Sequence, residues 1–560
     1  MDGFASMASV WNDWIRYKGP WLLTLRLLNA VLIRTSFNPD EYWQGPEVAH
    51  AWCYGGHLTW EWETCIALRG VLHPGLFALL LALLPEWPVL VAYAPRLLQG
   101  AFASLADWAV YRSADRLGSP LTCWALSVQL TGWFQLYALP RTFSSSLEAV
   151  LAAWIVERSI SSTSSSVAKW QTRQTRWLLL LGSLQVALRP TAAGFWLSWA
   201  IYKMYVLLQC GDLHGVFSGL LAPGLLISGV VLSFSTLLDC LYYGRFTLVP
   251  LNFLRFNLLA DGSALYGSHP WHWYFTEGLA VTLGTFLPFC CIGLRAVGSG
   301  HPLRPLVFSA FASILLISLA SHKEYRFLLP FFPLFSLLAG LGLQRASAWL
   351  QAKSAARARF YLLAVVFVPQ VFAAIFFCVV HQRGAEAVMT HLRNYPARGG
   401  IFFLTACHAT PFHSFLHGQE ELGYLDCSPG RNSPQKRFFE QPMPVLRELF
   451  PEAQHNATEE GPPKGAALKP CLDYRYEKSW PLPQVFVLWG SLLRREPRMQ
   501  PWLETNGYHL ELEIEDGIWS EGPYDIELWP SFSIFRKRCN SVKPRACSGV
   551  QRRAAACVQS

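Results

Sequence analysis

The sequence predicts a mainly α-helical protein that crosses a membrane several times and carries a smaller α/β domain near its C-terminus. Only 15% of its 560 residues are charged, against about 25% in a typical soluble protein, and 52% are hydrophobic. Apolar runs of near-spanning length recur between residues 72 and 380. After about residue 385 they give way to short apolar stretches, GGIFFLTAC and PQVFVLWG, which indicate buried strands.

The first apolar segment, residues 21–33, is short for a membrane span and contains Arg26. No small-residue cleavage site follows it, so we interpret it as an internal start signal rather than a cleaved leader. This interpretation places residues 1–20 in the cytosol. A first loop, residues 35–70, then lies on the opposite side of the membrane.

Basic loops set the orientation of the later segments, because positive charge marks the cytosolic side. Lys and Arg gather at 157–176, 295–304 and 345–359. The apolar runs then alternate across the membrane, which puts residues 241–274 and the sequence SHKEYRF (residues 321–327) on the far side. The predicted spans in this region are 275–293, about 305–320, about 327–343 and 360–380.

Two stretches interrupt the alternation. Arg189-Pro190 breaks the run at 177–206, because proline removes a backbone donor and clashes with the preceding turn. We expect a short hairpin there with its tip on the far side. The stretch 71–88 competes with 89–111 for one crossing, so either it re-enters the membrane without crossing or the arginines that follow break the charge rule.

The membrane domain is expected over residues 21–383 and a far-side domain over residues 384–535. Asn456 begins the acceptor sequon Asn-Ala-Thr, and its glycosylation requires that same side of the membrane. Residues 536–560 are basic and rich in small side chains, and we expect them to be disordered.

Composition argues against several other classes of protein. The net charge of +9 lies largely in short loops and the tail, and no nucleic-acid motif accompanies it, so we predict no nucleic-acid partner. No spacing of His, Asp or Glu demands a metal, and no cofactor is expected. The 14 cysteines contain no CxxC, but disulfides are possible among those in polar segments: Cys53, Cys65, Cys407, Cys427 and Cys471.

Two adjacent carboxylates, Asp40 and Glu41, follow the first apolar segment in NPDEYWQ. A carboxylate at a membrane surface can act as a general base toward an attacking hydroxyl. Neighbouring residues point in different directions, so only one of the two is expected to face a given site. Tyr42 and Trp43 offer rings on which a sugar could stack. The alternative is a pair of solvated loop charges at a helix start.

A cluster of cations lies in SHKEYRFLLP between two predicted spans. His322, Lys323 and Arg326 stand on the side opposite the basic loops, against the positive-inside trend. Cations at a membrane surface suit a phosphate, which Arg binds through paired hydrogen bonds. The alternative is a charged turn between two helices.

Other charged residues fall near the same side. PRTFSSSLE contains Arg141 and Glu148, which either serve a substrate or form a capping ion pair with each other. Arg189 lies at the predicted hairpin tip and is a further candidate for substrate contact. RGVLHPG could bind an anion through Arg69 and His73, but a helix start explains it better.

Aromatic and histidine side chains gather in LYGSHPWHWYFTEG, which contains His269, Trp271 and His272. They suit contact with carbohydrate, or alternatively an aromatic belt at the membrane interface. Together the far-side stretches predict an acid, a cationic phosphate site and platforms for a sugar. A lipid-linked phosphosugar donor needs all of these features.

The motifs NPDEYWQ, PRTFSSSLE, ALRPTAA and SHKEYRFLLP resemble those of the dolichol-phosphate-mannose-dependent mannosyltransferases of the GT-C class, glycosyltransferase family 22. This family acts in N-glycan and GPI assembly in the endoplasmic reticulum. The resemblance covers about residues 25–535, with the motifs in the same order. LYGSHPWHWYFTEG and TACHATPFHSFLH look most like the member that extends the GPI precursor. Ser145 departs from the pattern, which usually has Asn there.

The resemblance implies a GT-C fold in the endoplasmic reticulum membrane with a lumenal active site. The implied donor is dolichyl-phosphate mannose, and the implied acceptor is the GPI-anchor precursor, which gains its third mannose in α-1,2 linkage. Asp40 matches the family's first-loop acid and is the expected base, with Glu41 in support. We assign the donor phosphate to His322, Lys323 and Arg326 from their charges.

Three alternatives differ in function. An N-glycan lipid-linked-oligosaccharide α-1,2-mannosyltransferase would share the donor and base and differ in its acceptor pocket. A transporter or lipid flippase would also place charges and prolines in its spans, but the sequence has no internal repeat and its polar motifs gather on one side. A lipid- or glycan-binding subunit would not need Asp40.

Overall fold

A computed structural model describes residues 19–162, 173–259, 262, 264, 267–397, 399–406, 408–419, 421–428, 434–451, 480–521 and 526–538. The chain forms two compact units. The first contains the chain up to His381 together with the short segment His413–His417. The second contains Gln382–Phe412 and the chain from Gly418 onward.

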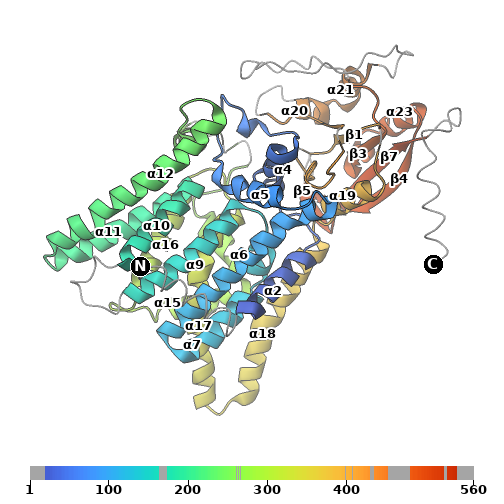
Figure 1. Ribbon diagram of the computed structural model, residues 1–560. Helices are drawn as coiled ribbons and strands as arrows, with labels where there is room; N and C mark the ends of the chain where they lie inside the picture. The colour runs from blue at the N-terminus through green and yellow to red at the C-terminus, as the bar shows by residue number, and fades with distance from the viewer. Residues whose placement is uncertain are drawn as a thin grey trace. The chain divides into compact units, whose positions relative to one another are not determined.

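The first unit is a bundle of helices (Figure 1). Short helical turns interrupt the bundle at Trp60–Trp62, Pro190–Ala192 and Tyr325–Phe331. The α-helices are α2 (Gly19–Leu32), α3 (Asp40–Trp43), α4 (Pro46–Tyr54), α5 (Leu72–Leu83), α6 (Pro88–Leu117), α7 (Ser119–Thr131), α8 (Trp133–Ala138), α9 (Ser144–Ser162), α10 (Arg173–Leu188), α11 (Ala193–Gln209), α12 (Ala222–Tyr243), α13 (Val249–Leu254), α14 (Leu279–Leu283), α15 (Leu287–Leu294), α16 (Arg304–Ile317), α17 (Phe332–Ala352) and α18 (Ala356–Ile375).

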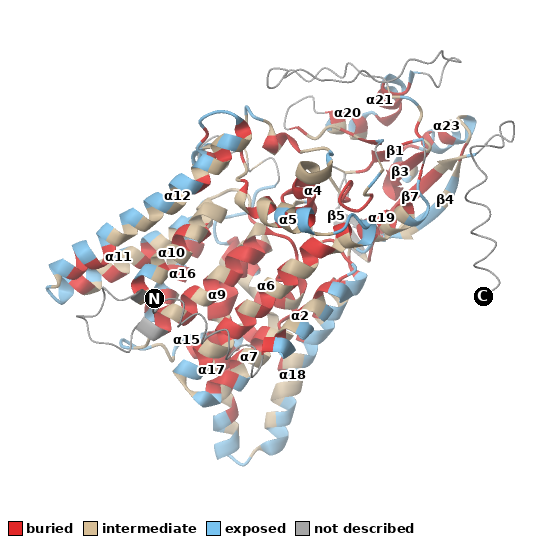
Figure 2. Ribbon diagram, in the orientation of Figure 1, coloured by how far each residue is buried: buried red, intermediate tan, exposed pale blue. Residues whose placement is uncertain are grey.

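Apolar surface on the outside of the bundle identifies a membrane protein. Figure 2 shows largely exposed outer faces on α11, α12 and α18, whereas α6, α9 and α17 fill the interior. Large exposed apolar surfaces mark contact with a membrane or a partner. Within the described residues, five helical stretches are long and apolar enough to cross a bilayer: Pro88–Leu117, Gly215–Tyr243, Tyr274–Leu294, Tyr325–Ala352 and Ala356–Asn394. The prediction of a mainly α-helical, multi-pass protein is confirmed.

The two irregular stretches take definite forms. The predicted break at Arg189-Pro190 is confirmed, because α10 ends at Leu188 and α11 begins at Ala193. The stretch 71–88 contains α5, whose 12 residues rise only ~18 Å, less than the roughly 30 Å of bilayer hydrocarbon. α5 is therefore too short to cross, which favours re-entry.

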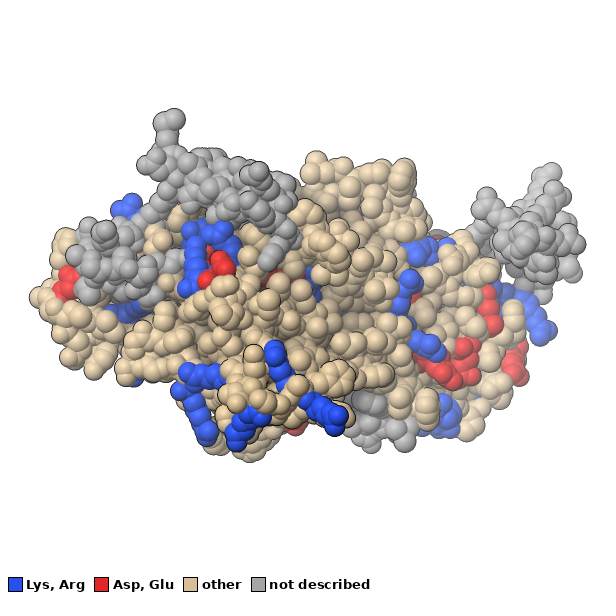
Figure 3. Space-filling model, turned by 90° about the horizontal axis from the view of Figure 1, so that it is seen from below, with Lys and Arg blue, Asp and Glu red and all other residues tan. Residues whose placement is uncertain are grey.

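The hairpin between α17 and α18 has a basic tip. Arg345, Lys353 and Arg357 are exposed there. Figure 3, which views the molecule from this end, shows Lys and Arg side chains gathered on the face. The positive-inside trend assigns such a tip to the cytosol.

Arg26, the charge in the first apolar segment, is buried in the bundle. Its guanidinium donates to both carboxylate oxygens of Asp107, at 2.6 and 2.7 Å. Gln129 donates to the same carboxylate at 2.9 Å. A buried charge in an apolar bundle needs such partners, and the pair ties α2 to α6.

The second unit is built on a five-stranded sheet with the order β2-β1-β3-β7-β4. β1 pairs in parallel with β2 and β3, while β7 pairs antiparallel with β3 and β4. β1 and β3 are buried at every residue, as strands covered on both faces should be. Both fall where the sequence predicts strands. The elements are α19 (Gly384–Asn394), β1 (Ile401–Leu404), β2 (Leu422–Tyr424), α20 (Pro434–Glu440), α21 (Pro442–Leu449), β3 (Val485–Trp489), α22 (Gly490–Arg495), α23 (Met499–Thr505), β4 (Tyr508–Glu515), β5 (Trp519–Glu521), β6 (Ile526–Leu528) and β7 (Ser531–Lys537).

The polar-segment cysteines behave differently from one another. Cys65 and Cys427 each take part in a disulfide. Cys53 is a free thiol, which donates to the carbonyl of Ala78 at 3.4 Å, so a disulfide there is excluded. The predicted glycosylation site Asn456 and the cysteines Cys407 and Cys471 lie outside the described residues. So do residues 1–18 and the tail after residue 538.

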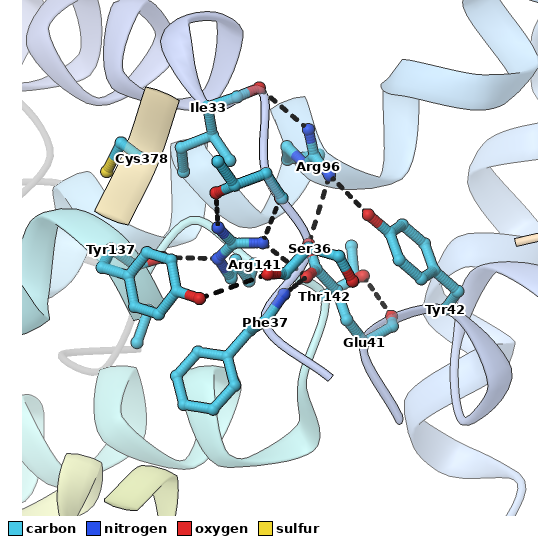
Figure 4. A network of polar contacts seen from close by, with 12 residues as sticks. Ile33, Ser36, Phe37, Glu41, Tyr42, Arg96, Tyr137, Arg141, Thr142 and Cys378 are labelled. Carbon is cyan, nitrogen blue, oxygen red and sulfur yellow. Dashed lines mark hydrogen bonds and ion pairs between the residues drawn. The ribbon is translucent and has the colours of Figure 1, made fainter. Parts of the chain in front are cut away.

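A buried carboxylate, Glu41, organises the start of the first loop (Figure 4). Arg141 donates to its Oε2 at 2.6 Å, and Arg96 donates to its Oε1 at 3.2 Å. The backbone N–H of Phe37 also donates to Oε2, at 3.2 Å. Glu41 is 0% exposed and cannot reach a substrate. The support that the sequence analysis expects Glu41 to give Asp40 therefore takes the form of anchoring the loop, not of contact with a substrate.

The same network binds Arg141 on all sides. Its N–H groups donate to the carbonyl and hydroxyl of Thr35, at 2.6 and 2.7 Å, and to the carbonyl of Tyr137 at 2.8 Å. The side chain is 0% exposed. The predicted substrate contact of Arg141 is therefore wrong. An ion pair with Glu148 is also excluded as its role, because Glu148 pairs with Arg189.

Replacing Glu41 by Ala leaves Arg96 and Arg141 buried without their carboxylate. Removing one partner of a buried ion pair costs about 3–5 kcal/mol, so the Glu41→Ala protein should unfold at a much lower temperature than wild type. Thermal unfolding of the detergent-purified protein, followed by tryptophan fluorescence, measures this. Glu86→Ala, which removes an exposed carboxylate, should change the midpoint little. Equal midpoints for Glu41→Ala and wild type would contradict the anchoring role.

Candidate active site

Asp40 is the partly exposed member of the carboxylate pair. It begins α3 directly after Pro39, whose φ of −55° is already helical. Consecutive helical residues point about 100° apart. The side chain of Asp40 is 32% exposed, whereas Glu41 is buried. The prediction that only one of the two would be available to a site is confirmed.

Arg326 is the direct partner of Asp40. Its Nη2 donates to Oδ2 of Asp40 and, at 2.6 Å, to Glu324, while its Nε donates to the other oxygen of Glu324 at 2.6 Å. The guanidinium lies over the ring of Phe143, 4.9 Å from its centroid. Nη1 makes no hydrogen bond to any residue that the structure describes. Arg326 is as buried as its neighbour Lys323, at 3% exposed, so what distinguishes it is this unbonded nitrogen, the one edge of the guanidinium that can still donate to an anion.

Glu324 holds Arg326 in place from within the same loop. Its carboxylate also accepts from the amide of Asn38 at 2.7 Å, and Nε2 of His322 lies 3.1 Å away. Burial acts to raise the pKa of Glu324, but the charge of Arg326 and the hydrogen bonds from His322 and Arg326 outweigh it and hold the pKa well below its ordinary value. Burial acts to lower the pKa of His322, but the hydrogen bond and charge of Glu324 raise it above its ordinary value. His322 is thus a partner of Glu324.

Lys323 does not join this cluster. Its Nζ donates to the backbone carbonyls of His269, at 3.0 Å, and Ala320, at 2.5 Å. The residue is 3% exposed. The ammonium fastens the stretch around His269 to the SHKEYRF loop, and in this arrangement it is not available to a phosphate.

Arg69 is a cation that sequence analysis did not assign to the site. It donates to Glu61 at 2.5 Å, and the charges of Asp40 and Arg326 both act on this pair. Its Nε is buried without a hydrogen-bond partner among the described residues. The sequence around Arg69 was explained as a helix start, which α5 confirms. Only the fold brings Arg69 within reach of Asp40.

The loop that carries Arg69 is fixed by α12 and α13. The hydroxyl of Tyr243 donates to the carbonyl of Arg69 at 2.8 Å, and the amide of Asn252 donates to the carbonyl of Ala67 at 3.1 Å. On the other side, the N–H of Val71 donates to Asp239 at 2.9 Å. The backbone is therefore held before, at and after Arg69.

Arg189, at the tip of the α10–α11 hairpin, lies near the same cluster. Its Nε is 3.0 Å from Glu148, and its Nη1 donates to Ser144 at 3.3 Å. Its guanidinium lies 5.0 Å from the ring centroid of Phe327, and that of Arg326 lies 5.4 Å from the same ring. The two arginines therefore flank one aromatic ring.

The aromatic stretch before α14 presents exposed rings. His269, Trp271 and His272 are exposed, and Trp271 is 63% exposed. The ring of His269 lies 4.8 Å from that of Trp273, which lies 4.8 Å from that of Tyr325. The stretch is thus joined to the SHKEYRF loop, and its exposed rings are available to a sugar or to the lipid interface.

Tyr42 and Trp43 lie in the interior instead. They are 2% and 3% exposed. The hydroxyl of Tyr42 accepts from Arg96 at 3.3 Å, and its ring meets that of Phe415 edge-on at 5.8 Å. The prediction that these rings stack on a sugar is corrected, because the short helix α3 turns them toward the bundle.

The site can therefore combine two chemical tasks. Asp40 offers a partly exposed carboxylate that can take a proton, and Arg326 and Arg69 offer guanidinium groups that can bind an anion. In the parts of the chain that the structure describes, no group of three or more His, Cys, Asp and Glu residues is arranged to hold a metal ion.

Comparison with known proteins identifies relatives over most of the chain. Residues 20–417 match the Alg9-like mannosyltransferase family. A protein named mannosyltransferase APTG1, from Arabidopsis thaliana, is 35% identical over 459 residues, which are 76% of this chain and 81% of that protein. GPI alpha-1,2-mannosyltransferase 3 of Danio rerio and of Homo sapiens are each 33% identical. Those matches cover 77% and 73% of this chain, and 79% and 71% of the respective relatives.

A solved structure shares the fold. The crystal structure of ArnT from Cupriavidus metallidurans bound to undecaprenyl phosphate superposes with a TM-score of 0.55, covering 93% of this chain and 98% of that one at 12% identity. This likeness confirms the predicted GT-C membrane fold. With the match over residues 20–417 and the relatives above 30% identity, it follows that the chain belongs to the Alg9-like mannosyltransferase family.

Proposed function

We propose that this mannosyltransferase adds the third mannose, in α-1,2 linkage, to the GPI-anchor precursor and takes it from dolichyl-phosphate mannose. The relatives named GPI alpha-1,2-mannosyltransferase 3 support the acceptor and the linkage. A protein of the same fold was solved with undecaprenyl phosphate, which motivates a polyprenyl phosphate donor here. The observation that carries the catalytic part of the proposal is the ion pair between Asp40 and Arg326.

Asp40 is the general base in this proposal. Its Oδ2 accepts from Arg326, while Oδ1 makes no hydrogen bond to the described residues and can accept one from a hydroxyl. The 2-hydroxyl of the acceptor mannose passes its proton to this oxygen as it attacks the anomeric carbon of the donor. Because a β-mannosyl phosphate yields an α-mannoside, one displacement with inversion suffices, without a covalent sugar–enzyme intermediate.

The leaving dolichyl phosphate is an anion that needs no proton. Nη1 of Arg326 and the guanidinium of Arg69 stabilise the charge that grows on it, and Arg189 adds positive charge nearby. A guanidinium has several nitrogens, so Arg326 can donate to the phosphate through Nη1 while Nε and Nη2 keep their carboxylate partners. Arg69 therefore contacts the phosphate in place of Lys323, whose ammonium is bonded to two carbonyls. His322 acts through Glu324.

The proposed site faces the lumen of the endoplasmic reticulum. The disulfides of Cys65, in the first loop, and of Cys427, in the second unit, support an oxidising compartment for both segments. The basic tip between α17 and α18 supports a cytosolic position for the opposite end of the bundle. Asn456 is glycosylated on the lumenal side in this arrangement.

Asp40→Asn tests the base, because the amide keeps the size of the side chain but cannot take a proton. Transfer from dolichyl-phosphate mannose to a GPI precursor with two mannoses should fall about 10²–10⁴-fold. The assay uses purified protein and a radiolabelled donor. Asp115→Asn, at an exposed aspartate near the end of α6, is the matched control and should keep wild-type activity.

Full transfer by folded Asp40→Asn protein would show that Asp40 is not the base. The acceptor is tested in the same assay by offering an N-glycan lipid-linked oligosaccharide in place of the GPI precursor. Transfer to that acceptor, and none to the GPI precursor, would favour the N-glycan alternative.

The arginine assignment predicts an order of effects. Arg69→Gln and Arg326→Lys should each lower kcat about 10²–10³-fold, because each removes a preorganised donor to the leaving phosphate. Lys323→Gln keeps an amide donor for the carbonyls that the ammonium binds, and should lower kcat less than Arg69→Gln. Steady-state kinetics over donor concentration measure all three. A larger loss in Lys323→Gln than in Arg69→Gln would restore Lys323 to the phosphate site.

The same assignment predicts metal-independent transfer, because the arginines neutralise the charge that a divalent cation would otherwise take. Activity of the purified enzyme should be unchanged after dialysis against EDTA. Activity that is lost on chelation and returns with added Mg²⁺ or Mn²⁺ would contradict this expectation.

A further inference from the structure

A five-residue segment, HSFLH (His413–His417), belongs to the membrane unit although the residues on both sides of it belong to the second unit. The match to the mannosyltransferase family ends at residue 417, the last residue of this segment. Ser414 and Phe415 are 1% and 2% exposed. Holding these five residues in one conformation costs conformational entropy, which their contacts with the membrane unit must offset.

Ser414 binds a buried carboxylate, Glu47, in the first turn of α4. The backbone N–H of Ser414 donates to Oε1 and Oε2 of Glu47, at 3.1 and 3.3 Å, and its hydroxyl donates to Oε1 at 2.5 Å. Glu47 is 1% exposed. Hydrogen bonds to a carboxylate are about twice as strong as neutral ones, and more so away from water. The HSFLH segment is therefore fastened to the start of α4.

An aromatic contact joins the same segment to the base of the first loop. The ring of Phe415 meets that of Tyr42 edge-on at 5.8 Å and that of Tyr93 at 5.6 Å. Tyr42 lies two residues after Asp40 in α3. The segment thus contacts α3 as well as α4.

A histidine pair joins the segment to the middle of α4. Nε2 of His50 lies 2.9 Å from Nδ1 of His417, and Nδ1 of His50 lies 3.0 Å from the carbonyl of Gly55. A carbonyl only accepts, so Nδ1 of His50 carries the proton and Nε2 accepts from His417. Burial lowers the pKa of His50 to about 4, with His417 and His413 acting in the same direction against the bond to Gly55. His50 is therefore neutral at pH 7, as this pairing requires.

α4 is coupled closely to α3, which begins with Asp40. Only Gln44 and Gly45 separate the two helices. A Cβ atom on Gly45 would lie 3.0 Å from the ring of Phe77 and 3.2 Å from the carbonyl oxygen of Thr142. The connection between the two helices is therefore tightly packed against its neighbours. A shift of α4 is therefore passed to α3.

We propose that Glu47 and Ser414 are positioning residues for Asp40. Their hydrogen bonds fix α4, and through Gly45 they fix α3, so that Asp40 keeps its bond to Arg326 and its place beside the acceptor hydroxyl. Their effect falls on the catalytic step rather than on donor binding, because the donor phosphate is held by arginines on other segments. The inference rests on the proposed role of Asp40 as the base.

Kinetics of the full-length purified enzyme test the proposal. Ser414→Ala should lower kcat about 10–100-fold while changing KM for dolichyl-phosphate mannose less than about twofold, the scale expected when a catalytic group is displaced by about 1 Å. Ser309→Ala is the matched control: its hydroxyl is also buried, but it bonds within α16 to the carbonyl of Pro305, and kcat should be unchanged.

A double-mutant cycle separates positioning from general loss of structure. If Glu47 and Ser414 act through their shared hydrogen bonds, Glu47→Gln combined with Ser414→Ala should lower kcat no more than the stronger single change. Losses that multiply would overturn the proposal. So would a wild-type kcat in Ser414→Ala, or a raised KM with kcat unchanged.

Asp40→Asn is measured in parallel. If it transfers mannose as well as wild type, the proposed base is wrong. If Asp40→Asn loses transfer while Ser414→Ala keeps a wild-type kcat, only the positioning role is wrong.

Discussion

The ion pair between Asp40 and Arg326 joins two segments that lie 286 residues apart in the sequence. In an apolar bundle, an ionised side chain without a partner is costly. The positions of the loops are therefore constrained by which charges can meet. Arg26 meets Asp107, Glu41 meets Arg96 and Arg141, and Arg189 meets Glu148. The Asp40–Arg326 pair differs from these because its carboxylate is partly exposed.

The number of side-chain nitrogens and oxygens that are already hydrogen-bonded separates the anchoring charges from the functional candidates. Arg141 donates to Glu41, Thr35 and Tyr137 and has no exposed surface, so it can only hold the framework. Arg326 keeps one nitrogen outside its bonds to Asp40 and Glu324. Removing a partner from the first kind of site costs stability, whereas changing the second kind alters how the site meets a ligand. Adjacent residues, such as Asp40 and Glu41, fall into different classes because one helical step separates inside from outside.

Much of the fold follows from local patterns in the sequence. The apolar runs predict the helices, Pro190 predicts the break before α11, and the short apolar stretches predict β1 and β3. These predictions succeed because periodicity and proline act on the backbone nearby. The motifs that contribute to the candidate site could also be picked out from the sequence, since charged motifs in an apolar protein are few.

Which residues make up the candidate site was harder to predict from the sequence. Lys323 and Arg326 occur in one motif with similar charge, but the loop backbone sends the ammonium of Lys323 to the carbonyls of His269 and Ala320. Arg69 was passed over because its neighbours in sequence explain it as a helix start. Its position near Asp40 depends on contacts from Tyr243 and Asn252, far along the chain. Side-chain direction in loops is set by such tertiary contacts, which leave no local pattern.

The proposed reaction makes particular use of an arginine shared between the base and the leaving group. As Asp40 takes the proton it loses its negative charge, and as the glycosidic bond breaks the dolichyl phosphate gains one. Arg326 contacts Asp40 already and presents Nη1 to the phosphate. One fixed guanidinium therefore lies beside the negative charge both before the reaction, on Asp40, and after it, on the phosphate. The total charge of the site does not change during this transfer. A reaction that conserves local charge around a fixed cation requires little reorganisation of its surroundings. The anchors at Glu41, Glu324 and Glu47 then serve one purpose, which is to keep Asp40 and Arg326 at the separation that this exchange needs.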